Sequence, residues 1–113
     1  MITGKVMLPV GVELDGVVHR DVVLRPQKVR DSIEAMEDER AVKNESYLGL
    51  LMQAKQIVSF GHLQQERINA DLLMDLYEVD MQALMEGAAK LRERLKTFRD
   101  AGDEPAQAAA GAA

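Results

Sequence analysis

Apolar and polar residues alternate along the first part of the chain, which predicts a β-hairpin over residues 5–25. In the first run the apolar residues take every second position: Val6, Leu8, Val10, Val12 and Leu14. This period of two is typical of a strand with one buried face. Pro9 lies within the run and favours an edge strand, because proline cannot donate a hydrogen bond to a ladder. A second strand follows Asp15-Gly16, which is a turn signal.

Two turn lengths are compatible with this hairpin, and each sets a different register. A two-residue turn at 15–16 pairs Leu14 with Val17 and mixes polar side chains into the apolar face. A three-residue loop at 14–16 pairs Glu13 with Val17 and keeps one face almost entirely apolar. We therefore expect the three-residue loop, because it buries one consistent face.

Beyond Pro26 the apolar residues recur at spacings of three and four, which predicts four helices. They cover about residues 29–40, 45–60, 70–76 and 79–99. The first has a thin apolar stripe of Val29, Ile33 and Met36 and a very acidic opposite side. The last is about 30 Å long at 1.5 Å per residue.

These elements define an α+β protein, in which an N-terminal β-hairpin is followed by a bundle of three to four helices. We expect one domain over residues 1–100. Residues 101–113 are rich in alanine and have no periodic apolar face. Such a segment cannot offset the entropy lost on ordering, so we expect a disordered Ala-rich C-terminal tail.

Composition excludes several classes of function. The 113 residues include no cysteine, which excludes a disulfide scaffold, a thiolate metal site and a cysteine nucleophile. The net charge of -5 argues against nucleic acid as the main ligand, since phosphate binding needs a surplus of cations. No apolar run approaches the roughly 20 residues that a membrane span needs. We expect a cytoplasmic protein that binds neither nucleic acid nor membrane.

The sequence contains no arrangement with the spacing of a catalytic, cofactor or metal site. His19 and His62 have no second ligand at metal-site spacing, and we expect both to be ordinary surface residues. The glycines form no phosphate-binding loop. The acidic run at 37–39 points in different directions around a helix, so its carboxylates cannot converge. We therefore expect a protein that is not an enzyme and holds no cofactor or metal.

The last predicted helix has the features of a partner-binding surface. Its apolar seam consists of residues at spacings of four and three: Leu84, Ala88, Leu91, Leu95 and Phe98. The seam is longer than the preceding short helix can cover, so we expect its end from Leu91 to Phe98 to be exposed and to self-associate or receive a partner helix. Methionines near its start suit an adaptable groove, although they fill cores as readily. Basic residues follow, which match an acidic partner but are also favoured there by the helix dipole. The candidate residues are Met81, Leu84, Met85, Leu91, Leu95, Phe98, Lys90, Arg94 and Lys96.

Two stretches of the chain carry a resemblance to a known family. Residues 15–25 follow the pattern DG-x-x-H/T-x-x-x-x-L-R, and residues 72–84 follow L-L-x-x-L-x-x-x-D-x-x-x-L. Over about residues 6–96 the chain resembles the tail assembly chaperone family of contractile-tailed phages and Mu-like prophages. It departs from that family at Lys28 and at Tyr77-Glu78, where many members carry a helix-capping residue.

The resemblance implies a non-enzymatic role in the host cytoplasm. Members bind the tape measure protein, keep it soluble, assist the tail tube protein to polymerise around it, and are absent from the mature virion. Many are made in two lengths by frameshifting, so the implied partners include a longer form of the chain, and we also expect a homo-oligomer. Two other classes remain open: a small dimeric DNA-binding regulator, and a structural tail subunit retained in the virion.

Overall fold

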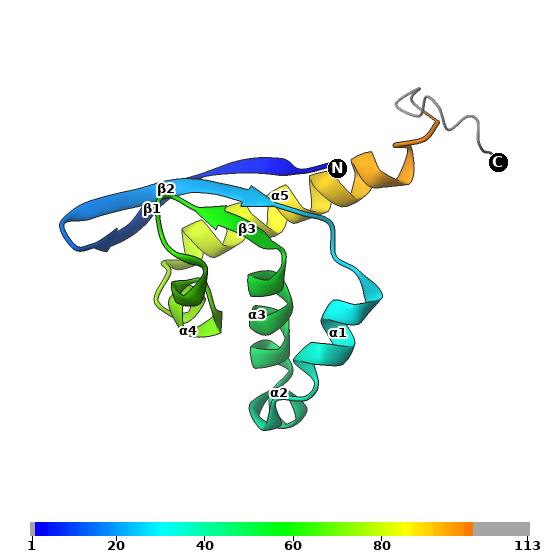
Figure 1. Ribbon diagram of the computed structural model, residues 1–113, viewed down its shortest axis with the longest axis horizontal. Coiled ribbons are helices and arrows are strands. Elements are labelled where there is room, and N and C mark those ends of the chain that lie inside the picture. Colours follow the sequence, from blue (N-terminus) through cyan, green and yellow to red (C-terminus); the bar gives the residue numbers. More distant parts are fainter. Residues whose placement is uncertain (1, 101–113) are drawn as a thin grey trace.

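The protein has an α+β fold, as predicted, in which a three-stranded antiparallel sheet packs with helices (Figure 1). The computed structural model describes residues 2–100, so the predicted disordered tail at 101–113 lies outside the described residues. In chain order the elements are β1 (Gly4–Leu14), β2 (Val17–Leu24), α1 (Val29–Ala35), α2 (Glu39–Lys43), α3 (Glu45–Lys55), β3 (Ile57–Phe60), the 3₁₀ turn η1 (Gln65–Arg67), α4 (Ala70–Met74) and α5 (Glu78–Lys96).

Helix α5 packs lengthwise against β1, and this pairing forms the main core. In Figure 1 the sheet and α5 both run along the long axis of the molecule and overlap in the view, while α1 to α4 project to one side. Gly87 allows the close approach, because a Cβ there would collide with the side chain of Val6 on β1. The buried residues of this core come from the sheet, α4 and α5: Leu8, Val22, Leu24, Ile57, Phe60, Leu73, Leu84 and Leu91.

The hairpin has the two-residue turn, so the predicted three-residue loop is wrong. Leu14 pairs with Val17, and Asp15 and Gly16 both have positive φ, at 54° and 78°. Two left-handed residues give the type I′ turn, whose twist matches that of paired strands. The prediction failed because it assumed one unbroken register along the whole hairpin.

The register changes in the middle of the hairpin at a wide bulge. Met7 pairs with Asp21 but Val12 pairs with His19, so four residues of β1 lie opposite Arg20 alone. The Arg20 Nε donates to the Leu8 carbonyl, 2.8 Å away, across this bulge.

A carboxylate from the first turn of α5 holds the bulge. Asp80 is fully buried, and its two oxygens accept hydrogen bonds from the backbone N–H groups of Val10 and Gly11, at 2.9 and 2.8 Å. Gly11 has a φ of 86°, which suits glycine. The bulge turns Val10 outward, so this residue does not join the apolar face predicted for it.

The helix predicted over 29–40 is two helices. Helix α1 ends at Ala35, and α2 begins after Asp38, whose carboxylate accepts a hydrogen bond from the Arg40 N–H. Asp38 is therefore an N-cap that interrupts the predicted helix. Helices α2, α3 and α4 meet in a smaller core around Ala41, Tyr47 and Ala70.

The helix predicted over 45–60 ends early and continues as a strand. Helix α3 stops at Lys55, and β3 pairs antiparallel with β2, with Phe60 opposite Val22. A short apolar run does not distinguish a strand from the end of a helix, and the open edge of β2 decides the outcome. The helices predicted over 70–76 and 79–99 are confirmed as α4 and α5, with shorter C-terminal ends.

Candidate partner-binding surface

Helix α5 borders an open groove, whose other walls are the segment between β2 and α1, the start of α1, and α3. Two adjoining hollows of about 330 and 660 Å³ share Pro26, Gln27 and Leu95. We call their combined lining the α5 groove. The first hollow adds Gln53, Gln56, Met85, Ala88, Ala89 and Arg92, and the second adds Ile2, Arg25, Lys28, Arg30, Asp31, Glu34 and Phe98.

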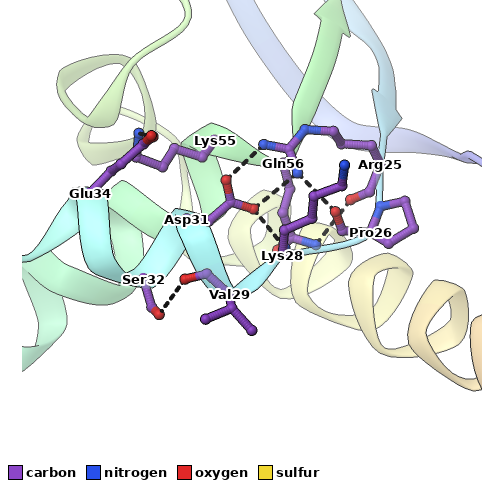
Figure 2. Close-up of polar contacts among 9 residues, drawn as sticks. All are labelled: Arg25, Pro26, Lys28, Val29, Asp31, Ser32, Glu34, Lys55 and Gln56. Atoms are coloured by element: carbon purple, nitrogen blue, oxygen red, sulfur yellow. Dashed lines mark hydrogen bonds and ion pairs between the residues drawn. The ribbon is translucent and has the colours of Figure 1, made fainter.

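The wall formed by α1 is fixed by an ion pair that lies beside Pro26 (Figure 2). The Arg25 guanidinium donates two hydrogen bonds to the Asp31 carboxylate, both 2.9 Å long. Asp31 also accepts from the backbone N–H of Lys28, at 2.8 Å. The Arg25 hydrogen bond lowers the pKa of the Asp31 carboxyl below its ordinary value, against the opposing effect of burial. Lys28 is the N-cap of α1 but makes no capping hydrogen bond with its side chain, and the bond from its backbone N–H to Asp31 takes that role.

A second set of contacts joins this wall to α3 and β3. The Arg25 N–H donates to the Gln56 carbonyl at 2.8 Å, and the Gln56 side chain donates back to the Arg25 carbonyl at 3.1 Å (Figure 2). The Lys55 ammonium lies 3.0 Å from the Glu34 carboxylate on α1. The segment around Pro26 is therefore held from both sides, and the groove is pre-formed.

Two of the predicted partner-binding residues are core residues, which corrects their assignment to a partner-binding surface. Leu84 and Leu91 are at most 1% exposed and lie in the main core. Met81 is partly buried and packs against the same core. The prediction compared the seam only with the short helix before it, whereas the long β1–β2 hairpin covers it. The seam is therefore intramolecular as far as Leu91.

Three other predicted residues do line the α5 groove: Met85, Leu95 and Phe98. Met85 is 59% exposed and Leu95 is 39% exposed. The expected exposure of the end of the seam is thus correct for Leu95 and wrong for Leu91. These three side chains give the groove much of its apolar character.

The predicted basic residues lie on α5 but not in the lining of the groove. Arg94 donates to the Thr3 carbonyl at 3.0 Å, and Lys96 pairs with Glu93 at 3.0 Å. Lys90 is exposed. Arg92, which belongs to the same basic stretch of the sequence but is not among the candidate residues, does line the groove. Its spacing of seven from Met85 and three from Leu95 places all three on one helical face, and this was the available signal.

The cations Lys28 and Arg30 reach the groove from outside α5. They come from the segment before α1 and from its first turn, far from α5 in sequence. The α5 groove thus combines apolar side chains with four cationic ones, of which Arg25 is paired with Asp31. Its other carboxylate, Glu34, is paired with Lys55. Such a surface can take the apolar stripe of an amphipathic helix whose flanks are acidic.

The two histidines lie together at the far end of the sheet. His19 is buried, contrary to expectation, and its Nδ1 accepts a hydrogen bond of 3.2 Å from the backbone N–H of His62. Their ring centroids are 6.3 Å apart. Within residues 2–100 no group of three His, Asp or Glu side chains is placed to hold a metal ion. No helix in the same part of the chain is long and apolar enough to cross a membrane.

No family model matches this sequence, and comparison with curated proteins and with solved structures finds no significant match.

Proposed function

We propose that this chain is a non-enzymatic tail assembly chaperone of a contractile-tailed phage or prophage. It binds the tape measure protein in the host cytoplasm, keeps it soluble while the tail tube protein polymerises, and leaves before the virion is complete. The observation that carries the proposal is the α5 groove, in which Met85 and Leu95 are exposed beside Arg92. The resemblance of residues 15–25 and 72–84 to the chaperone family supplies the partner.

The groove has the chemistry that a long amphipathic helix requires. An apolar stripe on the partner would cover Met85 and Leu95, which water otherwise contacts. Carboxylates beside that stripe would face Arg92 on one wall and Lys28 or Arg30 on the other. Methionine adds adaptability, because its unbranched side chain repacks against different partner residues. One groove can therefore bind successive segments of a long helical protein.

Co-expression with the tape measure protein tests the proposal. We expect the wild-type chain to keep that protein in the soluble fraction and to co-purify with it. The double variant Met85→Glu/Leu95→Glu should lose both effects and stay folded by circular dichroism, since both side chains are partly exposed. Val18→Glu is the matched control, because Val18 is equally exposed on the hairpin, away from the groove. It should behave as wild type.

Each other outcome identifies a different error. If the double variant co-purifies as well as the wild type, the groove is not the binding site. If the wild type does not bind and is found by mass spectrometry in purified virions, the chain is a structural tail subunit. If it binds DNA at physiological salt instead, it is a regulator.

A further inference from the structure

The outer face of α1 is apolar and uncovered. Val29, Ile33 and Met36, which we call the α1 stripe, are between 56% and 79% exposed. The buried side of the helix is instead formed by Asp31 and Ala35. Contiguous exposed apolar side chains on a small protein mark an interaction surface.

The α1 stripe and the α5 groove carry opposite charge. The three residues that follow the stripe, Glu37, Asp38 and Glu39, are all acidic, whereas the lining of the α5 groove contains four basic side chains and two acidic ones. Glu37 and Glu39 are exposed next to the stripe. The groove presents Arg92 and Lys28. The stripe is thus the kind of ligand that the groove fits: apolar residues at helical spacing, flanked by carboxylates.

The stripe is also short enough to fit within the groove. From Val29 to Met36 the stripe covers about 10 Å of helix, and from Met85 to Leu95 the groove covers about 15 Å. The two surfaces are neighbours in the fold, because Lys28 and Arg30 at the start of α1 line the groove. If a two-fold axis passes between the stripe and the groove, the stripe of each copy meets the groove of the other copy.

We propose that a second copy of this chain docks here, with the α1 stripe of each copy seated in the α5 groove of the other. The contact is reciprocal and closes on itself, so it produces a dimer and not a filament. Because the same groove receives the partner helix in the proposed function, on which this step rests, the dimer is a closed state that the partner helix must open. Self-association and partner binding then exclude each other.

A charge exchange tests the pairing by sedimentation velocity on the full chain. In Glu37→Arg/Glu39→Arg the stripe becomes basic, and in Lys28→Glu/Arg92→Glu the groove becomes acidic. We expect the wild type to dimerise and each variant alone to be monomeric, because each then opposes like charges in both contacts. An equimolar mixture should dimerise again, since both contacts of the mixed pair join opposite charges.

Apolar variants provide the matched control. Ile33→Ser should weaken the dimer, whereas Val18→Ser on the hairpin should leave it unchanged. A monomeric wild type overturns the proposal, and so does a dimer that persists in both charge variants or fails to return in their mixture.

Failure of this inference differs from failure of the proposed function. Glu37→Arg/Glu39→Arg keeps its α5 groove, so it should co-purify with the tape measure protein at least as well as the wild type. If the charge exchange succeeds and the wild type never binds that protein, the dimer stands and the chaperone role falls. If the charge exchange fails while the tape measure protein still binds, the chaperone role stands alone.

Discussion

Helices α1 and α5 both carry apolar residues at spacings of three and four, but they turn these residues in opposite directions. On α5 the pattern lies inside the main core as far as Leu91, and Leu95 beyond it is partly exposed. On α1 the residues of the pattern face outward, and the polar Asp31 is buried. The comparison shows that an amphipathic pattern identifies a face without saying what covers it.

Different contacts orient the two helices. Helix α5 gains by burying large side chains against the sheet, at about 1.5–3 kcal/mol for each. Helix α1 is too short to gain as much, and its orientation follows from the pairing of Asp31 with Arg25 and of Glu34 with Lys55. Its apolar residues are then left exposed.

The largest expected loss of stability follows from truncating a side chain of α5 that lies in the main core. Leu91→Ala should lower the free energy of unfolding by about 2–5 kcal/mol, because it removes buried methyl groups and leaves a cavity. Urea unfolding followed by circular dichroism measures this effect. Met85→Ala on the exposed side of the same helix is the control and should change stability by less than about 1 kcal/mol. Equal losses would show that α5 is not seated as described.

The next effect concerns the carboxylate of α5 that holds the β1 bulge. Asp80→Asn keeps one acceptor oxygen and leaves one of the N–H groups of Val10 and Gly11 unpaired, which should cost about 1–3 kcal/mol. Hydrogen exchange at these two amides should accelerate, while exchange at β3 changes less. The exposed Asp75→Asn serves as the control. Unchanged protection at Val10 and Gly11 would contradict the assignment.

The local sequence pattern predicted the elements of this fold better than it predicted how those elements pair with one another. The hairpin strands and the seam of α5 follow from residue spacing alone. The register does not, because Asp80 fixes it from about 70 residues away in sequence. Strand β3 was missed because Ile57 and Phe60 continue an apolar helical face and become a strand only beside β2.

The residues of the α5 groove also divide into those that the local pattern predicted and those that only the fold brings together. Met85, Leu95 and Phe98 were predicted because they share one helix with a recognisable seam. Lys28 was not, because it reaches the groove from another segment and only the fold brings it near α5. Leu84 and Leu91 were misassigned because no pattern within α5 reveals that a sheet lies on it.

A smaller loss of stability is expected when the ion pair between Asp31 and Arg25 is removed, and this loss should depend on pH. Asp31→Asn should cost about 1–2 kcal/mol at neutral pH, because it removes charged hydrogen bonds to Arg25. The folded-state pKa of Asp31 is lowered, so the carboxylate stabilises the fold above its ordinary pKa near 4. As pH falls through the folded-state pKa, the carboxylate is protonated in both states and this contribution disappears.

Urea titrations of the wild type and Asp31→Asn from pH 7 downward should therefore converge in acid. Asp71→Asn is the control, since Asp71 is largely exposed and its ion pair with Arg40 is long, at 3.9 Å. A difference between wild type and Asp31→Asn that stays constant with pH would mean that the ion pair does not orient α1.

The smallest change is expected on the exposed side of α1, where Ile33→Ser should alter the free energy of unfolding by no more than about 0.5 kcal/mol. Isoleucine and serine have similar helix propensities, so the substitution isolates the effect of apolar burial. Ile33 is 62% exposed, whereas Leu91 is 1% exposed. The measurement must be made at a concentration where the chain is monomeric, since a dimer would add its own stability. A loss as large as that of Leu91→Ala in the monomer would mean that the α1 stripe is covered within one chain, and the contrast between the two helices would no longer hold.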